Sequence, residues 1–338
     1  MIPTNHIPSN FKNIIKRITY PRIPANISKN FKNLNESASA EVARSLINHY
    51  FNKQIWNNIN SPEEYLSSGE GQRDLFGHLK GRLDGFRRTV IPWLNDAKLL
   101  LGANILEIGC GTGSLTVALA EQGAKVAAMD IDEESLIVAK DRCRIYELNA
   151  DFFKANANMA SSLFLDRHFD FIIFSASLEH LNHMERIAAM KNTWNMLSTD
   201  DLWCVIEAPN RLWYFDAHTS ILPFYHWLPD DLALEYSRFS PRQPYRNAYR
   251  EKNLESMASF LRHGRGVSFH EFDLSMKKVE ELEVVSSLPL YIRKRNLILQ
   301  LAWWFTLDHR YESVLASVGP KIHKGFYQQF LNLIIKKS

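Results

Sequence analysis

The middle of the chain alternates between short apolar runs and longer stretches with helical spacing. Between the apolar runs, the apolar positions recur at helical intervals, as after Ser114, where Leu115 and Leu119 share one face. An alternation of strand and helix predicts a parallel sheet that is covered by helices on both faces. The five apolar runs predict β-strands at residues 104–108, 125–129, 151–155, 169–174 and 202–207.

Helical patterns precede this core, and a mixed pattern follows it. Residues 37–101 predict an N-terminal helical layer, with helices at 37–56, from Ser61 onward and at 75–94, the last of them broken by Pro92. After the core we expect a helix at 274–282, a strand at 283–286, a long helix at 297–318 and a final strand at 330–335.

The stretch 208–273 lacks a regular hydrophobic period and is rich in aromatic residues and proline. A long loop-rich insertion in a compact domain is usually functional, so we expect a substrate lid here. Residues 267–271 alternate like a strand or an edge of the lid. In that arrangement His270 and Glu271 would reach the functional site.

Length and composition are those of an ordinary globular protein. The chain has 338 residues, of which 46% are hydrophobic, and this is enough for a sizeable core. Its net charge of +3 is small, so the overall charge gives no argument for nucleic acid as a partner. The three cysteines, Cys110, Cys143 and Cys204, lack C-x-x-C spacing, which favours a reducing compartment and argues against a structural zinc site. We therefore expect a cytoplasmic protein.

The first 35 residues contain Lys and Arg but no Asp or Glu, and residues 1–36 predict a basic, flexible arm. One interpretation is a solvated arm that lies across the domain; the other is an amphipathic segment that contacts anionic lipid or serves as a targeting signal. No apolar run reaches the ~18 residues of a membrane-spanning helix. Trp303 and Trp304, which follow the basic stretch 293–295, fit either the protein core or a membrane interface.

The most informative stretch is residues 104–113, an apolar run that ends in Gly109, Gly111 and Gly113 and then opens a helix. Glycines permit a sharp turn, and the free N–H groups of a helix start offer hydrogen-bond donors to a ligand. A second strand ends in Asp130, about twenty residues further on, where a carboxylate can bind ribose hydroxyls. By itself this arrangement suits NAD, FAD or S-adenosylmethionine.

The spacing of the loop separates these cofactors. Dinucleotide-binding loops have the pattern G-x-G-x-x-G, but here the third glycine comes one residue early. Glu107, two residues before the first glycine, would repel a pyrophosphate but suits a cofactor with an amino group and a sulfonium. With Glu-Ile-Gly-Cys-Gly-Thr-Gly at 107–113, the chain resembles the class I S-adenosylmethionine-dependent methyltransferases over residues 80–210.

The resemblance implies an α/β fold: a doubly wound, Rossmann-like, seven-stranded sheet with an antiparallel last strand, an N-terminal helical layer and a lid insertion after strand five. The methyltransferase domain would cover residues 102–338, with the substrate lid at 208–273. The expected cofactor is S-adenosylmethionine. Its binding residues would be Glu107, Gly109, Cys110, Gly111, Gly113, Asp130, Ile131, Asn156, Ala157, Ser175 and Ala176.

Within this set, the resemblance assigns particular roles. Glu107, Gly109 and Gly111 would hold the methionine part of the cofactor, and Asp130 the ribose. Asn156 stands where the family has an acid that accepts from the adenine amino group, and its carboxamide oxygen can accept the same hydrogen bond. Cys110 is interpreted as a packing residue. Residues 169–181 are similar to the fourth strand and its V-L-E-H-L continuation, which would bring Ser175 and Ala176 beside the sulfonium.

Methyl transfer needs the donor and the acceptor in line, and often a base that removes one proton. The candidates for this base are His180, His218 and His226, because histidine titrates near neutrality. The alternative is that His180 caps its helix or packs on the cofactor, and that the other two orient the lid. Together with Asp216 they lack the H-x-x-x-H or D-x-D spacing of a metal site, and we expect no metal.

The lid should also bind the acceptor. Its aromatic side chains would suit an acceptor with apolar and polar faces, unless they only form a small core of the lid itself. The candidate substrate-binding residues are Arg211, Trp213, Tyr214, Phe224, Trp227 and His270.

The resemblance and the residues together predict an S-adenosylmethionine-dependent methyltransferase with a biosynthetic role. The acceptor would be an oxygen or nitrogen of a small or carrier- or lipid-linked molecule. Residues 175–178 are unlike the (N/D)-P-P-(Y/F) segment of nucleic-acid amino-methyltransferases, so no nucleic-acid partner is expected. Two alternatives remain: a non-catalytic cofactor-binding or scaffold protein, and a membrane-peripheral enzyme.

Overall fold

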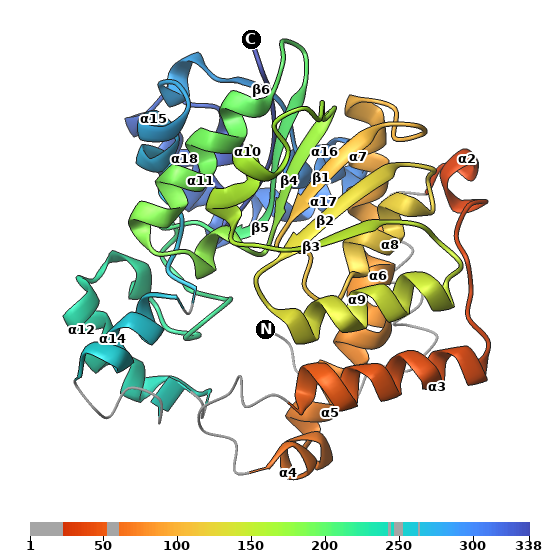
Figure 1. The fold of residues 1–338 in the computed structure, drawn as a ribbon. Coiled ribbons are helices and arrows are strands. Elements are labelled where there is room, and N and C mark those ends of the chain that lie inside the picture. The colour runs from red at the N-terminus through yellow and green to blue at the C-terminus, as the bar shows by residue number, and fades with distance from the viewer. Residues whose placement is uncertain (1–22, 53–60, 243–244, 247–252, 263) are drawn as a thin grey trace.

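A single seven-stranded sheet forms the centre of the computed structural model, which describes residues 23–52, 61–242, 245–246, 253–262 and 264–338 (Figure 1). The strand order is β3-β2-β1-β4-β5-β7-β6, and only β7 runs antiparallel to its neighbours within the sheet. The predicted seven-stranded sheet with an antiparallel last strand is thus confirmed. The strands are β1 (Asn104–Ile108), β2 (Lys125–Asp130), β3 (Asp151–Lys154), β4 (Phe171–Ser175), β5 (Leu202–Pro209), β6 (Glu283–Ser287) and β7 (Phe330–Lys336).

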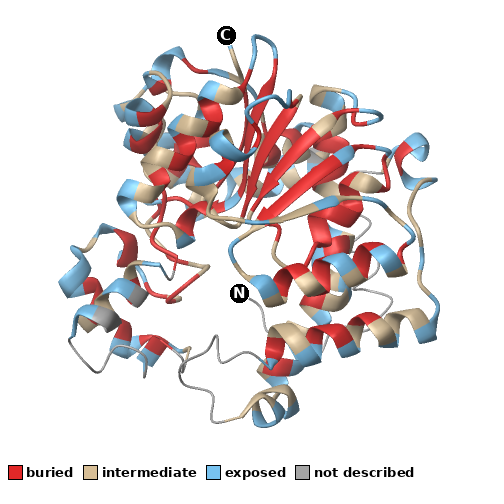
Figure 2. Ribbon diagram, in the orientation of Figure 1, coloured by how far each residue is buried: buried red, intermediate tan, exposed pale blue. Residues whose placement is uncertain are grey.

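The central strands are buried on both faces, as their continuous apolar runs predicted (Figure 2). Successive side chains of a strand enter opposite cores: Ile105 belongs to one cluster of buried residues and Leu106 to the other. One face is covered by α6 (Arg82–Gly85), α7 (Ile91–Ala97), α8 (Ser114–Ala120), α9 (Glu133–Ile145) and α16 (Leu288–Lys294), and the other by α10 (Ala160–Leu163), α11 (His183–Met196) and α15 (Phe269–Ser275).

The edge of the sheet at which the parallel strands begin is tied together by charged side chains. Lys98 Nζ lies 3.1 Å from a carboxylate oxygen of Asp201 and 2.7 Å from one of Asp170. His168 Nε2 lies 2.9 Å from the other oxygen of Asp201. These contacts join the starts of β1, β4 and β5, and they lie on the opposite edge from the glycine loop.

The N-terminal helical layer is present. Its helices between residues 36 and 76 lie beside the carboxyl edge of the parallel strands, whereas α6 and α7 cover a face of the sheet (Figure 1). Ser61 accepts a hydrogen bond from Glu64 N and so begins a helix where the sequence predicts one. The helical run does not break at Pro92, because α7 continues to Ala97. A π-helical turn precedes α7. The regular α-helical hydrogen bonds, one of which proline would remove, are therefore already interrupted at this point. The elements are α3 (Glu36–Ser45), a π-helical turn (Leu46–Phe51), α4 (Pro62–Ser67), α5 (Gly69–Phe76), π-helical turns Gly77–Gly81 and Phe86–Val90, and α6 between them.

The described part of the predicted basic arm packs on the domain. Ile27, in α2 (Ala25–Ser28), is buried in the core. Lys32 N donates to Glu121 Oε1 at 2.9 Å, and the buried Arg87 donates both to Glu121 and to Lys32 O. Residues 1–22, on which most of the arm prediction rests, lie outside the described residues.

Between β5 and β6, the strand interpretation of residues 267–271 and the predicted start of the next helix are wrong. Residues 267–271 do not form a strand: apart from one bridge between Asn210 and Val267, they start α15. Ser268 and Glu271 form a capping box, which begins the helix here and not at residue 274 as predicted. The helix ends at Ser275, and only a short 3₁₀ turn, Val279–Glu281, follows it before β6.

The long helix expected at 297–318 is two helices, α17 (Leu297–Trp304) and α18 (Leu307–Val318). The Thr306 hydroxyl accepts from His309 N and caps the second helix, so the chain turns at Phe305. Within the described residues, no helix has the length and apolar content that crossing a membrane requires.

The predicted lid has its own small core and helices. Figure 1 shows its helices on the same side of the sheet as α4 and α5, where the parallel strands end. Its described elements are a 3₁₀ turn (Tyr225–Trp227), α12 (Asp230–Tyr236), a second 3₁₀ turn (Ser237–Phe239) and α14 (Leu254–Leu261), and its buried apolar residues are Leu222, Tyr225, Ala233, Leu234, Tyr245 and Phe260.

Candidate functional site

The glycine loop connects β1 to α8 and has three residues with positive φ: Gly109 at 76°, Gly111 at 51° and Gly113 at 77°. A Cβ on Gly109 would lie 2.3 Å from Ser177 Cβ, and one on Gly113 would lie 2.9 Å from Ala139. A Cβ on Gly111 would meet no atom within 4 Å. The outer two glycines are therefore required by packing, whereas Gly111 faces open space where a ligand can approach the backbone.

Asp130, at the end of β2, is held against this loop. One of its carboxylate oxygens accepts from Gly111 N at 2.8 Å, and the other from Asp132 N at 2.9 Å. The next residue, Ile131, leaves 65% of its surface exposed, which is unusual for an apolar side chain. A carboxylate beside an exposed apolar side chain offers hydrogen-bond acceptors to a ribose and an apolar surface to a base.

Glu107 lies inside the sheet, with 1% of its surface exposed. The Thr116 hydroxyl donates to Glu107 Oε2 at 2.6 Å. Burial raises the pKa of Glu107 to about 8, and the charge of Asp130 contributes to the increase. Without a bound cation, Glu107 is therefore protonated at neutral pH, and an ammonium group beside it would favour the ionised form.

The raised pKa of Glu107 predicts a pH-dependent cost of folding. The unfolded chain loses this proton near pH 4.5 and the folded chain only near pH 8, so the free energy of unfolding should fall as pH rises between these values. Glu107→Gln removes the titration and should flatten that decline. Urea unfolding of both proteins at several pH values from 5 to 8 measures the effect, and parallel pH profiles would contradict it.

Asn156 follows β3, and its side chain is already used. Its Oδ1 accepts from Asn158 N at 3.0 Å and so caps the 3₁₀ turn that begins at Ala157. A carboxamide oxygen has two lone pairs and keeps one acceptor position. The predicted adenine contact of Asn156 is compatible with this geometry, but the residue also has a local structural role.

Cys110 is buried within the glycine loop, and burial raises its pKa well above the ordinary value of a thiol. A thiol that stays protonated is a poor nucleophile. Cys143 and Cys204 are buried as well, with their pKa values raised by the same cause. This geometry favours the interpretation of Cys110 as a packing residue.

The chain segment after β4 lies against the end of β1. Ser177 Oγ donates to Ile108 O at 3.0 Å, while Ser175 is buried and Ala176 has a φ of 46°. A positive φ is strained for alanine, and such strain is common at functional sites. The two candidate residues Ser175 and Ala176 thus lie at the carboxyl end of β4, next to the first glycine.

Glu179 was not among the residues singled out from the sequence. Its side chain is fully buried, and neither carboxylate oxygen has a hydrogen-bond partner. A buried carboxylate without a partner is costly, so this arrangement calls for a ligand or a proton. The signal that could have found it is its place in the Leu-Glu-His-Leu segment, where only His180 drew attention.

The structure brings two of the three candidate histidines to Glu179. His180 Nε2 lies 3.9 Å, and His218 Nε2 3.6 Å, from Glu179 Oε1. Burial lowers the pKa of His218, which favours the neutral imidazole that a general base requires. His180 and His218 therefore belong to one site, although His180 follows β4 and His218 follows β5.

His226 lies elsewhere within the lid. It is buried, its Nδ1 accepts from Gly266 N at 3.1 Å, and its Nε2 lies 3.3 Å from Asp216 Oδ1. Burial raises the pKa of Asp216, but the close contact with His226 and the hydrogen bonds from backbone N–H groups outweigh it and lower the pKa. Since both ring nitrogens face groups of the lid, the geometry favours the alternative that His226 orients the lid backbone.

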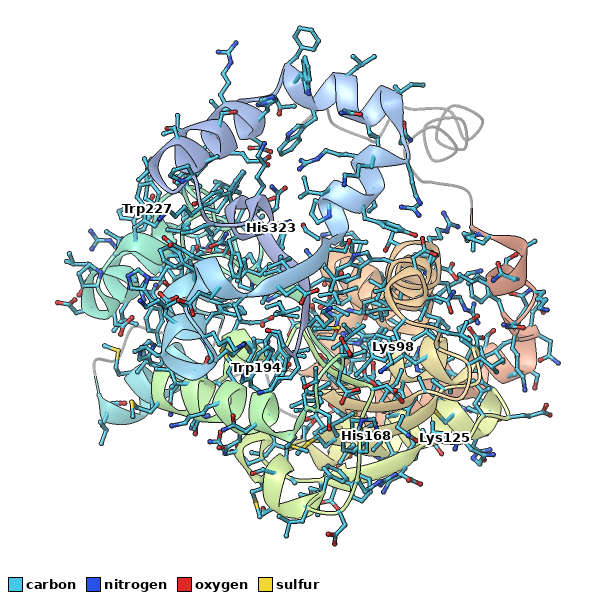
Figure 3. The ribbon with its side chains drawn as sticks, turned by 90° about the horizontal axis from the view of Figure 1, so that it is seen from above. Lys98, Lys125, His168, Trp194, Trp227 and His323 are labelled. Atoms are coloured by element: carbon cyan, nitrogen blue, oxygen red, sulfur yellow. The ribbon has the colours of Figure 1, made fainter. Side chains whose placement is uncertain are left out.

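The candidate acceptor residues do not form one cluster. Trp213 is buried against Tyr311 of α18, with ring centroids 5.2 Å apart, and the Tyr214 hydroxyl donates to Asp308 of the same helix. Phe224 and Trp227 are exposed and pack on each other, and Figure 3 shows Trp227 at the periphery of the molecule.

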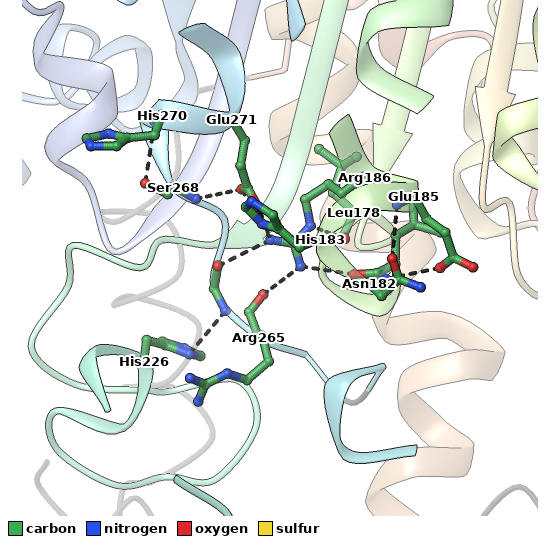
Figure 4. A network of polar contacts seen from close by, with 12 residues as sticks. Leu178, Asn182, His183, Glu185, Arg186, His226, Arg265, Ser268, His270 and Glu271 are labelled. Atoms are coloured by element: carbon green, nitrogen blue, oxygen red, sulfur yellow. Dashed lines mark hydrogen bonds and ion pairs between the residues drawn. The ribbon is translucent and has the colours of Figure 1, made fainter. Parts of the chain in front are cut away.

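The polar members of that set are also apart. Arg211 is exposed next to Gly266, whose added Cβ would meet the Arg211 backbone at 2.9 Å. His270 is exposed in the first turn of α15, and its ring points away from Arg186 (Figure 4). The neighbouring Glu271, also considered for this site, is buried and bound to Arg186.

Arg186 joins the lid to the segment that carries Glu179 and His180. It is buried and donates to the carbonyl oxygens of Leu178, Leu181, Arg265 and Gly266, and to Glu271 (Figure 4). Residues 178–181 leave β4, whereas 265–271 close the lid. One side chain thus fixes the distance between the two parts of the site.

The N-terminal layer reaches the glycine loop from the other side. His78 Nδ1 lies 3.2 Å from Thr112 Oγ1, and Tyr50 packs on His78 with ring centroids 4.4 Å apart. Asp130 contributes to the raised pKa of Tyr50, of which burial is the main cause. No sequence motif indicated either residue, because their proximity depends on how the layer packs.

Glu207, at the end of β5, is a further side chain that sequence reasoning missed. It is solvent-exposed with a φ of 59°, yet surrounding protein raises its pKa, and the charge of Glu179 adds to this. A bulge in the pairing of β5 with β7 lies at this residue. Bulges re-aim side chains near functional sites, and this one lies near the carboxyl end of β5.

Comparison with known proteins agrees with this geometry. Residues 105–200 match a family model described as a methyltransferase domain. The chain is 32% identical over 106 residues to a magnesium-protoporphyrin O-methyltransferase of Rhodobacter capsulatus, covering 30% of this chain and 43% of that protein. It is 33% identical over 85 residues to a ubiquinone biosynthesis O-methyltransferase of Dechloromonas aromatica, covering 22% and 37%. The matches thus span well under two thirds of these relatives.

Among solved structures, the magnesium protoporphyrin IX methyltransferase of Synechocystis with bound S-adenosylmethionine is similar, at 21% identity and a TM-score of 0.36, over 53% of this chain and 80% of that one. The strand order, the antiparallel β7 and the glycine loop fit a class I methyltransferase domain, and the family model matches residues 105–200. The resemblance inferred from the sequence is confirmed. The cofactor of this class is S-adenosylmethionine.

Proposed function

We propose that the protein is an active S-adenosylmethionine-dependent methyltransferase that methylates an oxygen or nitrogen of a small-molecule acceptor. The observation that carries this proposal is the arrangement of Asp130, Gly111 and Glu107 at the ends of β1 and β2. It offers acceptors to a ribose, an open approach to the loop backbone and a buried carboxyl group for an ammonium.

The names of two of the relatives support a small acceptor. Those reported above are O-methyltransferases of magnesium-protoporphyrin and of ubiquinone biosynthesis. Within this proposal, the names of these relatives favour transfer to oxygen and a biosynthetic role. We include a cytoplasmic location in this proposal, and the free, buried cysteines fit it.

In the proposed reaction the acceptor atom attacks the methyl carbon in line with the departing sulfur. The chain contributes orientation, exclusion of water and removal of a proton. His218 is our candidate for the base, because burial lowers its pKa, which favours the neutral form, and because it extends from the lid to the segment after β4. His180 lies beside it, with ring centroids 6.4 Å apart.

Titration calorimetry with S-adenosylhomocysteine tests cofactor binding. Asp130→Ala should weaken binding by about 10- to 100-fold, since hydrogen bonds to a charged group contribute about 1.5–3 kcal/mol. Asp166→Ala, at an exposed aspartate after α10, is the matched control and should bind like the wild type. Equal affinity in all three proteins would contradict the assigned cofactor site.

Catalysis needs a separate measurement, because cofactor binding alone also fits a scaffold protein. Transfer of a labelled methyl group from S-adenosylmethionine can be followed over a panel of phenols, carboxylic acids and amines. Transfer to one class identifies the acceptor chemistry. Tight cofactor binding without transfer to any class would favour the non-catalytic alternative.

Peripheral membrane contact is a second proposal, and it rests on α17. Ile298, Leu301, Trp304 and Phe305 are large apolar residues that are exposed on or beside this helix, next to the basic residues 293–295. Exposed apolar side chains beside basic residues suit an anionic lipid surface.

Co-sedimentation with vesicles that contain anionic lipid tests this contact. Replacing Trp304 and Phe305 by serine should reduce binding at least several-fold, whereas the control pair Leu101→Ser and Leu165→Ser, equally exposed on other surfaces, should not. A truncation that removes residues 1–22 tests the arm separately. Equal binding by both double variants would exclude α17 as the contact.

A further inference from the structure

Three potential metal ligands meet at the end of β4. They are Glu179, His180 and His218, and one ligand atom of each lies within 4.8 Å of the others. The shortest approaches are 3.6 and 3.9 Å, from the two Nε2 atoms to Glu179 Oε1. Ligands about 2.0–2.2 Å from a tetrahedral ion lie roughly 3.3–3.6 Å apart, so small side-chain rotations bring all three onto one ion.

Glu179 is the strongest indication of a ligand. It is fully buried and aimed at the two histidines, but neither carboxylate oxygen has a hydrogen-bond partner. The ring nitrogens opposite are too distant for a hydrogen bond. Native proteins seldom leave a buried carboxylate in this state, and a bound cation would satisfy both of its oxygens.

His180 is oriented as a metal ligand usually is. Its Nδ1 lies 3.0 Å from the carbonyl oxygen of Arg262, so Nδ1 carries the proton and donates it. That fixes the tautomer in which Nε2 has a free lone pair, and Nε2 is the atom that faces Glu179. A backbone carbonyl behind a ligating histidine is a common second contact in metal sites.

The backbone of His218 is held by hydrogen bonds within the lid. Its backbone N–H donates to Asp216 Oδ1 at 3.0 Å, within the turn that Asp216 organises. The Arg242 guanidinium donates to His218 O at 3.0 Å. The third ligand is therefore positioned by the lid, while the first two come from the chain after β4.

We propose that Glu179, His180 and His218 bind a divalent first-row transition metal ion. One carboxylate and two imidazoles form a ligand set typical of Zn²⁺, Fe²⁺, Mn²⁺ or Co²⁺. Three protein ligands leave at least one coordination position open.

The metal site does not depend on the proposed function, but its role does. If the domain methylates an acceptor, the open position would bind an acceptor oxygen near the end of β4. With its Nε2 lone pair on the ion, His218 would then hold the metal in place of acting as the base, and the ion itself would favour loss of the acceptor proton. Because His218 belongs to the lid, the ion would also join the lid to the body of the domain. Cofactor affinity should then be independent of the metal, whereas methyl transfer should depend on it.

Titration of the chelator-treated full chain with Co²⁺ tests the site directly, because Co²⁺ gives visible absorption bands that report its ligands. We expect binding of one equivalent, competition by Zn²⁺ and a rise in thermal unfolding temperature. His180→Ala and His218→Ala should each weaken binding at least tenfold. His309→Ala, in α18 and remote from the cluster, is the matched control and should bind like the wild type.

The outcomes separate the two proposals. Absence of saturable Co²⁺ and Zn²⁺ binding, or equal affinity in the three histidine variants, would overturn the metal site while leaving cofactor binding untouched. Loss of S-adenosylhomocysteine binding in Asp130→Ala with metal binding intact would have no bearing on the ion. Circular dichroism of each variant excludes misfolding as the cause, and Glu179→Gln provides a fourth, buried variant at the same site.

Discussion

Arg186→Met is expected to lower the free energy of unfolding by about 3–5 kcal/mol, the usual cost of removing one partner from a buried ion pair. Arg186 and Glu271 are both buried, with a contact of 2.9 Å. The substitution also removes the donors from four carbonyl oxygens of the lid and of the chain after β4. We expect the lid to separate from the body of the domain more readily, which urea unfolding and limited proteolysis within 208–273 would measure.

The control is another arginine that joins the lid to α11. Arg262 makes two contacts with Glu185, at 2.8 and 2.7 Å, but its side chain is largely exposed. Exposed ion pairs contribute at most about 1 kcal/mol, so Arg262→Met should change stability little. Similar losses in the two variants would mean that the Arg186 network does not anchor the lid.

Gly109→Ala is expected to be the most damaging single substitution in the glycine loop. A positive φ costs a non-glycine residue about 1–2 kcal/mol, and the added Cβ would lie 2.3 Å from Ser177 Cβ. Relief of such a clash by backbone movement costs typically about 1–3 kcal/mol more. The movement would separate the ends of β1 and β4, so cofactor affinity should fall with stability.

Gly102→Ala separates the two causes. Gly102 also has a positive φ, at 78°, but a Cβ there would meet no atom within 4 Å. It should show the backbone cost alone, without loss of cofactor affinity. Chemical denaturation and calorimetry on both variants measure the difference, and equal effects would show that the contact with Ser177 is unimportant.

The sheet could be predicted closely because its signals are local. The apolar runs and glycines around β1 and β2 gave strand positions within a residue or two, and the resemblance supplied the antiparallel last strand. The elements that were predicted wrongly, at 267–275 and 297–318, depend on capping by Ser268 and Thr306. These caps compete with hydrophobic periodicity, which carries no information about where a helix begins.

The candidate functional residues also divide into those that local sequence predicts and those that depend on tertiary packing. The amino-acid sequence by itself determined the glycine loop, Glu107 and Asp130, because their spacing along one strand-loop-helix-strand unit fixes their geometry. Only the tertiary structure decided that His218 joins Glu179 and His180, while His226 remains within the lid. The physical reason is that His218 and Glu179 are separated by a helix, a strand and a turn, and only the packing of the lid against β4, held by Arg186, brings them together.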